Sequence, residues 1–123
     1  IIESDRVMGI NVRDGALVNE VLFKNIRAEF CHPDRKQTGI NFYITKRNRH
    51  TSSLGKIQKI TLQDCTFEMA FPKKWAFYRH YSQTQKNDLS VHLKNVFVGG
   101  KKIERMDSEF FDLEKNNGEL TFN

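Results

Sequence analysis

The sequence has little of what several specialised protein classes need. It contains 2 prolines and 7 glycines among 123 residues, which excludes collagen-like and proline-rich disordered chains. No apolar run approaches the roughly 20 residues of a membrane-spanning helix, so no membrane partner is expected. A net charge of +5 favours an acidic partner only mildly. This length and composition predict a single globular domain over residues 1–123.

Cysteine is also scarce. Cys31 and Cys65 are far apart in the sequence, so the chain lacks the CxxC pairs of common zinc sites. We therefore expect no metal and no cofactor. A disulfide between the two cysteines and a buried free thiol at Cys65 are both open, and an exported protein would suit the disulfide.

Three segments of eight residues share one pattern. Residues 21–28, 60–67 and 91–98 each read apolar, x, apolar, x, Asn or Asp, apolar, x, apolar. Alternation is typical of a strand with one buried face, but its phase slips by one residue at the Asn or Asp. A bend there keeps both halves facing inward, and Asn and Asp tolerate left-handed backbone angles. The pattern predicts corners at Asn25, Asp64 and Asn95.

Further strands are expected between these segments, at residues 9–13, 40–44 and 119–122. Residues 46–53 and 70–88 are expected to be irregular, and residues 108–113 to form a short helical turn.

Short strands that recur with corners predict an all-β fold. The favoured architecture is a right-handed parallel β-helix, a solenoid of about four coils in an incomplete stack. Residues 100–123 are expected to form a closing or capping segment. An antiparallel sandwich or jelly roll stays open, because Asp14-Gly15 and Asn117-Gly118 are typical hairpin turns.

The segment GINVRDGALVNEVLFKNIRAEF, at residues 9–30, resembles the C-terminal half of pectin-degrading β-helix enzymes. The most similar family is the polygalacturonase-like glycoside hydrolases of family 28. There a Gly-x-Arg-Ile-Lys strand precedes a coil of the form V-x-N-I-x-F-x-N-I, which residues 18–26 resemble. Residues 55–67 and 89–103 resemble later coils of the same family.

This resemblance implies a portion of a secreted or periplasmic enzyme that acts on a polysaccharide, with a pectin-like or other acidic glycan as partner. The family's catalytic motifs, Asn-Thr-Asp, Asp-Asp and Gly-His-Gly, are all absent from the sequence. Inverting hydrolysis requires two convergent carboxyl groups, so no catalytic residue is predicted in this chain. The expected contribution is to complete the glycan groove. The alternative is a non-catalytic carbohydrate-binding or adhesin-type β-helix.

Six residues are candidates for substrate binding. Arg13 occupies the family's Lys position and could pair with a uronate carboxylate, whereas Asn11 replaces the family's Arg. Tyr43 is a loose match to the family's substrate-contacting tyrosine. The segment at residues 72–81 mixes cations with aromatic rings, which suits sugar rings as well as nucleic acids. It adds the candidates Trp75, Tyr78 and Arg79.

Three further expectations concern the partners and the origin of the chain. Nucleic acid is not expected, because the excess of positive charge is moderate. The chain begins with Ile1 and has no signal peptide, which predicts a processed chain or a section of a longer protein. An incomplete stack exposes strand edges, so we expect its N-terminal end to bind an upstream segment or a second copy of the chain.

Overall fold

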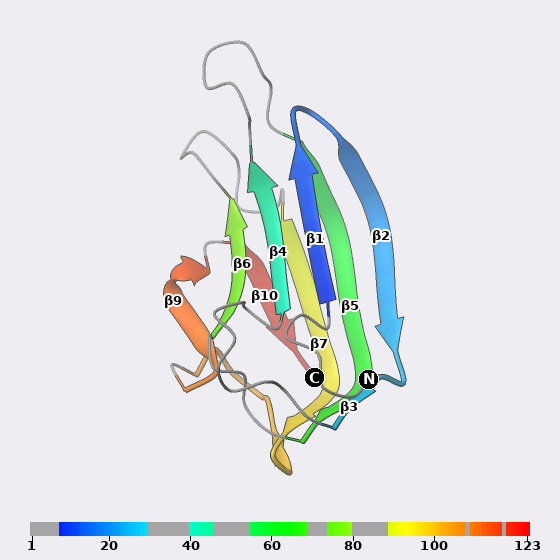
Figure 1. The fold of residues 1–123 in the computed structure, drawn as a ribbon, viewed down its shortest axis with the longest axis vertical. Coiled ribbons are helices and arrows are strands. Elements are labelled where there is room, and N and C mark those ends of the chain that lie inside the picture. The colour runs from blue at the N-terminus through cyan, green and yellow to red at the C-terminus, as the bar shows by residue number, and fades with distance from the viewer. Residues whose placement is uncertain are drawn as a thin grey trace.

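The computed structural model describes residues 8–29, 40–45, 55–68, 74–79, 89–107, 109–116 and 118–123. Every regular element among these residues is a β-strand (Figure 1), so the all-β prediction is confirmed. The described part of the chain contains no helix able to span a membrane. In chain order the strands are β1 (Met8–Arg13), β2 (Leu17–Lys24), β3 (Arg27–Ala28), β4 (Ile40–Thr45), β5 (Lys56–Phe67), β6 (Trp75–Arg79), β7 (Leu89–Val98), β8 (Lys101–Lys102), β9 (Phe111–Asn116) and β10 (Glu119–Phe122).

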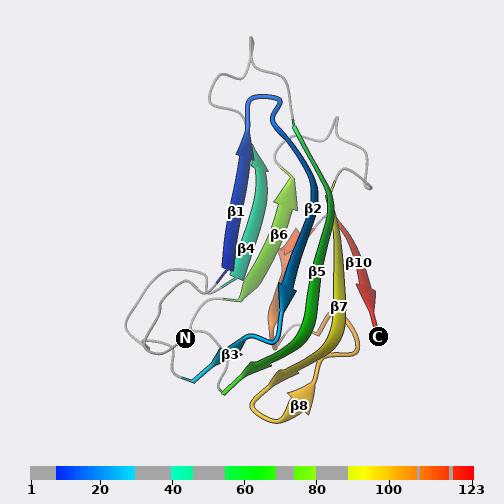
Figure 2. The same ribbon diagram turned by 90° about the vertical axis from the view of Figure 1, so that its right-hand side faces the viewer.

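The strands form two sheets. Sheet A has the order β1-β4-β6-β9, and sheet B has the order β10-β7-β5-β2, with β3 beside β5 and β8 beside β7. The chain passes to the other sheet after each long strand, so the two sheets take their strands alternately (Figure 2). Neighbouring strands are parallel in both sheets, and the β7–β8 hairpin is antiparallel.

This topology contradicts the antiparallel alternative. Asp14 and Gly15 both adopt positive φ angles, 53° and 83°, as a hairpin turn requires. The strands that they join, β1 and β2, nevertheless belong to different sheets and do not pair with each other. The turn therefore transfers the chain between sheets.

The three predicted corners are confirmed. Asn25, Asp64 and Asn95 have φ angles of 57°, 53° and 56°, in the left-handed region that few residues other than glycine adopt. Residues on both sides of each corner face the core. On β5, for example, Leu62 before the corner and Cys65 after it are both fully buried.

Successive corners contact one another. The N–H of Asn25 donates to the carbonyl oxygen of Gln63 at 3.0 Å. One step further, Nδ2 of Asn95 donates to Oδ1 of Asp64 at 2.8 Å, and the N–H of Asn95 donates to the carbonyl oxygen of Asn123 at 3.0 Å. The bends are therefore stacked along the same edge of the molecule.

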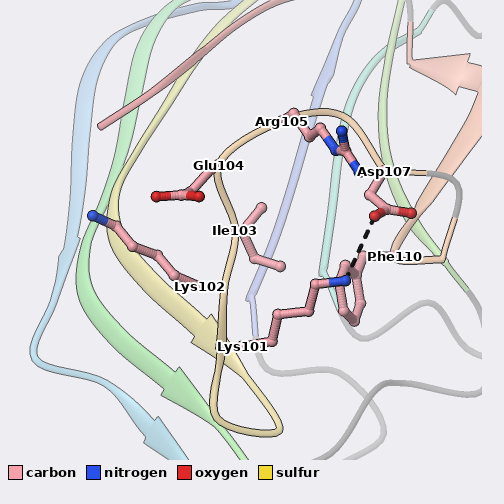
Figure 3. A pocket seen from close by; sticks show the side chains of 7 residues that line it. All are labelled: Lys101, Lys102, Ile103, Glu104, Arg105, Asp107 and Phe110. Atoms are coloured by element: carbon pink, nitrogen blue, oxygen red, sulfur yellow. Dashed lines mark ion pairs between the residues drawn. The ribbon is translucent and has the colours of Figure 1, made fainter.

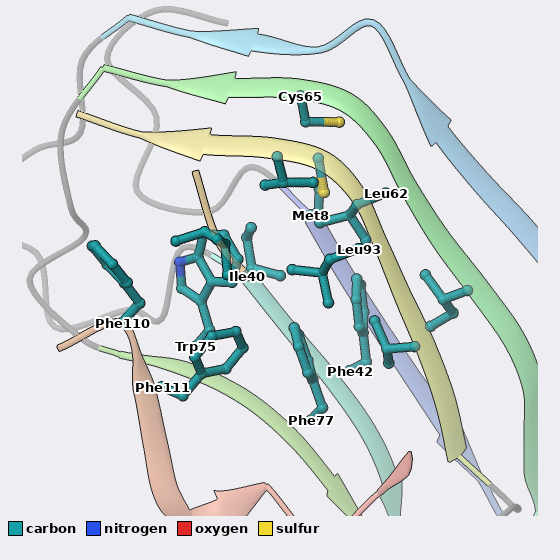
Figure 4. Close-up of a cluster of buried hydrophobic side chains, with 14 of the residues drawn as sticks. Met8, Ile40, Phe42, Leu62, Cys65, Trp75, Phe77, Leu93, Phe110 and Phe111 are labelled. Carbon is teal, nitrogen blue, oxygen red and sulfur yellow. The ribbon is translucent and has the colours of Figure 1, made fainter. Parts of the chain in front are cut away.

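The core lies between the sheets and is rich in aromatic rings (Figure 4). Phe42 is fully buried, and its ring stacks on Phe77 with a centroid distance of 5.0 Å and on Phe23 with one of 5.9 Å. Strands of equal register place equivalent side chains above one another, as Phe42 and Phe77 show.

Cys65 is a buried free thiol, so the disulfide alternative is wrong. The thiol contacts the carbonyl oxygens of Phe23 and Gln63 at 3.5 and 3.4 Å. Burial raises the pKa of Cys65, which keeps the group protonated and unreactive. Cys31 lies outside the described residues.

Two local predictions are corrected by the structure. Residues 75–79, within the stretch expected to be irregular, form strand β6. The helical turn expected at residues 108–113 is a turn at residues 109–110 followed by strand β9. The closing segment also supplies a strand to each sheet, since Leu120 of β10 pairs with Val91 of β7.

Candidate functional site

Strand alternation on sheet A turns two predicted site residues outward. On β1, Met8 and Val12 are buried at 2% and 4% exposure, whereas Asn11 and Arg13 are exposed. Successive side chains of a strand point to opposite faces, so apolar residues fill the core and the polar pair reaches solvent. We call the outward surface of β1, β4 and β6 the sheet A face.

Asn11, Arg13 and Thr45 form one hydrogen-bonded cluster. In the amide orientation that satisfies both ends of Asn11, its nitrogen donates to Thr45 Oγ1 at 2.9 Å, and its oxygen accepts from Arg13 Nε and Nη2, both at 3.2 Å. Arg13 pairs with Thr45 in the β1–β4 register. Two neighbouring strands therefore position one guanidinium group.

This arrangement leaves the guanidinium able to bind an anion. Arginine carries more N–H donors than the contact with Asn11 uses, and the Nη1–Nη2 end remains available for a carboxylate in a bidentate pair. The amide and the hydroxyl beside it can exchange hydrogen bonds with hydroxyl groups. The cluster thus combines an exposed cation with neutral polar groups.

The strand register brings other predicted residues to the same face. Tyr43 is partly buried and pairs with Asn11 on one side and with Tyr78 on the other. Arg79 instead pairs with Ile44, which is fully buried, so its register position is not one of those on the sheet A face. The structure describes the backbone of Tyr78 and Arg79, and their side chains lie outside the described part. Asn11, Tyr43 and Tyr78 thus form one row across three strands.

The prediction that Trp75 binds substrate is wrong. Trp75 is 2% exposed, and its ring meets Phe67 and Phe111 edge to face, with centroid distances of 5.4 and 5.5 Å. The first residue of β6 has the inward phase, so both indole faces pack in the core (Figure 4). The aromatic-basic segment therefore supplies core as well as surface.

Thr45 is a site residue that the sequence reasoning missed. The expected strand ended at residue 44, one position short of Thr45. The signal was present, because β-branched threonine favours strands and continued alternation after Ile44 places residue 45 outward. Only the β1–β4 register shows that it stands beside Arg13.

The described residues offer no metal site. They contain no group of three or more His, Cys, Asp or Glu side chains able to hold a metal ion. On the described sheet A face, the outward side chains of β1 and β4 are amide, guanidinium, phenol and hydroxyl groups and a glycine, without a carboxylate. These two strands therefore present a cation and neutral polar groups, and no acid, on their outward side.

A cavity of about 200 Å³ lies in the closing segment (Figure 3), bounded by Lys101, Lys102, Ile103, Glu104, Arg105, Asp107 and Phe110. Nζ of Lys101 lies 3.8 Å from Asp107 Oδ2 and 3.5 Å from Glu109 Oε2, and 5.7 Å from the centroid of the Phe110 ring. The pKa of Asp107 lies below its usual range, chiefly because its carboxylate accepts a hydrogen bond from the N–H of Glu109, and also because cations lie nearby. These contacts fix the turn before β9.

No family model matches the sequence, and no curated protein and no solved structure matches the chain.

Proposed function

We propose that the chain is a section of a right-handed parallel β-helix whose sheet A face binds an acidic, pectin-like polysaccharide, as part of a polygalacturonase-like glycoside hydrolase. Three features support the solenoid: parallel strands, alternation between two sheets, and stacked corners. Parallel crossover connections are right-handed in almost all proteins, which supports the stated hand. A secreted or periplasmic location stays a prediction that accompanies this function.

The cluster of Asn11, Arg13 and Thr45 is the observation that carries the proposal. It holds an exposed guanidinium at a fixed place on the sheet. Tyr43 stands beside it in register, and the face of an aromatic ring is a suitable partner for the apolar side of a sugar ring. A uronate residue offers the matching groups, one carboxylate among several hydroxyls.

Calorimetric titration of the full chain with a trimer of galacturonic acid tests this function. We expect binding that Arg13→Ala weakens roughly tenfold to a hundredfold, the effect of losing a charge-assisted hydrogen-bonded pair. Arg27→Ala removes the same charge from an exposed side chain paired with Glu29 and serves as the matched control. Equal loss in both variants, or equal affinity for the methyl-esterified trimer, would remove Arg13 from the site.

One observation favours a second candidate, a binding domain without hydrolytic activity. The described outward residues of β1 and β4 include no carboxylate, and the catalytic motifs of the resembled family are absent from the sequence. Neither candidate predicts hydrolysis by this chain alone, and incubation of the chain with an acidic trimer tests that shared expectation. If new reducing ends appeared, and substitution of an acidic residue of the chain abolished them, this chain would itself hydrolyse the substrate.

A further inference from the structure

Sheet B carries a second surface feature, on its outward side. On β2, two successive residues, Asn19 and Glu20, are exposed between inward positions. On β5, Gln58 and Lys59 are likewise both exposed. A strand with strict alternation exposes one residue at a time, so each strand carries an extra outward residue at the same level.

The neighbouring strand β7 does not have the extra residue. Ile57 pairs with Leu89 and Ile60 pairs with Val91, so the two residues of β5 face the single residue Ser90. This is a β-bulge, which bends the strand and re-aims its side chains. The register between β2 and β5 continues through the bulge, so both strands bend together while β7 stays regular.

The aligned bulges leave a shallow hollow of about 380 Å³ across three strands. Its lining side chains are all polar, and they are Asn19, Glu20, Gln58, Lys59, Ser90 and His92. Bulges are features that proteins place beside functional sites. We call this surface the sheet B hollow.

His92 is held in place within the hollow. Its Nδ1 makes a hydrogen bond with Thr121 Oγ1 from β10, the residue with which it pairs in the β7–β10 register. A hydrogen bond at one ring nitrogen fixes the ring orientation and the role of the other nitrogen. Nε2 is then the ring nitrogen that a ligand can meet.

We infer that the sheet B hollow binds one neutral sugar unit. Glu20 and Lys59 pair in register, so the lining of the hollow carries one acidic and one basic side chain, whose formal charges cancel. The two amides, the hydroxyl and the imidazole supply mixed donors and acceptors, which match hydroxyl groups that act as both. Leu22, 54% exposed, lies one outward position from Glu20 along β2 and offers an apolar border for the CH face of a sugar ring.

This site differs from the sheet A face in position and in chemistry. The sheet A face has a fixed cation, Arg13, and suits an acidic sugar. The hollow lies on the opposite sheet and suits an uncharged one. A polysaccharide with acidic and neutral parts could therefore contact both the sheet A face and the sheet B hollow. Its contact with the hollow would not depend on Arg13.

Amide NMR titration of the full chain with uncharged trimers of glucose, galactose and mannose tests the inference. We expect at least one trimer to shift the amide resonances of residues 19–20, 58–59 and 90–92, in a saturable way. Gln58→Ala should weaken this binding about tenfold or more, because it removes hydrogen bonds that the ligand would use. Gln63→Ala changes the same residue type on the same strand outside the hollow, and should leave the affinity unchanged.

Three outcomes would overturn the inference. They are no shift at these amides up to saturating trimer, equal weakening in both glutamine variants, or shifts caused only by charged trimers. Arg13→Ala separates this inference from the proposed function. If neutral trimers bind Arg13→Ala as they bind the wild type, the hollow stands whatever the acidic trimer does.

Discussion

The corner residues show how single side chains set the course of the chain. Asn25, Asp64 and Asn95 have positive φ angles, and Asp64 and Asn95 also share a side-chain hydrogen bond. Asp64 and Asn95 thus combine two properties, tolerance of a left-handed backbone and a short polar side chain that bonds to the neighbouring corner, whereas Asn25 contacts the next strand through its main-chain N–H.

Substitution of Asn95 separates these two properties. Asn95→Gly keeps the backbone conformation and loses the side-chain hydrogen bond to Asp64, so we expect a small decrease in the free energy of unfolding. Asn95→Ala also strains the backbone and should cost about 1–2 kcal/mol more. Urea denaturation measures both. Equal stability of the two variants would show that the positive φ imposes no strain.

The stability of the Asp64 corner should depend on pH. The pKa of Asp64 is lowered from its ordinary value of 3.8, chiefly by the hydrogen bond from Asn95. The stabilisation is complete above the unfolded-state pKa and is lost as the pH falls through the lower folded-state pKa. Asp64→Asn should therefore lower the Tm at pH 7, and the difference should shrink as the pH falls below 3.8. A Tm difference independent of pH would contradict this assignment.

The sequence predicted these corners because the phase of alternation slips at one recognisable residue type. Thr45 and the sheet B hollow were missed for another reason. Each depends on which residues stand side by side on neighbouring strands, and a single sequence does not contain that register.

At the scale of elements, alternation predicted the strands with one clearly polar face. Strand β6 was missed because polarity does not alternate along it. Trp75 and Phe77 face the core, but the residues between and after them include Ala76 and Tyr78, which are not polar enough to mark an outward face. For β9, the adjacent buried residues Phe110 and Phe111 fit a turn followed by a strand, and in the sequence they also fitted a helical turn.

The contact between successive turns depends on Gly55. A Cβ there would lie 2.1 Å from the carbonyl oxygen of Ala16 and 2.5 Å from Val12 Cγ1. The same oxygen accepts the N–H of Lys56 at 3.1 Å, so it cannot move without loss of a contact between neighbouring strands. We expect Gly55→Ala to cost about 2–3 kcal/mol of stability.

Gly100→Ala is the control for this prediction. Gly100 has a φ of 80° and no atom within 4 Å of an added Cβ, so its substitution carries backbone strain of about 1–2 kcal/mol without a clash. Both variants are compared by urea denaturation. If Gly55→Ala were no more destabilised than Gly100→Ala, the close approach to Ala16 would not constrain the fold.

At the scale of the whole molecule, the inward side chains of strand β2 are less buried than those of its neighbour β5. Ile57, Ile60 and Leu62 of β5 are fully buried. Val21 and Phe23 of β2, which pair with Ile60 and Leu62, are only partly buried. Strand β2 is also an edge strand, and paired edges are a common route to association.

Self-association through the N-terminal end, where β2 is an edge strand of sheet B, stays a prediction that sedimentation can test. We expect the sedimentation coefficient to rise with protein concentration, and Val21→Lys to suppress the rise by placing a charge among apolar side chains. Leu22→Lys adds the same charge to the outward side of the same strand and should have little effect. A single monomeric species at all concentrations, or equal suppression by both variants, would contradict association through this end.

The proposal that the sheet A face binds an acidic glycan is tested most directly by locating where such a glycan binds on the chain. Amide NMR titration of the wild-type chain with a galacturonic acid trimer should shift the resonances of Asn11, Arg13, Tyr43 and Thr45, and leave those of the sheet B hollow unchanged. Saturable shifts confined to other surfaces, or no shifts at the sheet A face, would contradict the proposal that this face binds acidic polysaccharide.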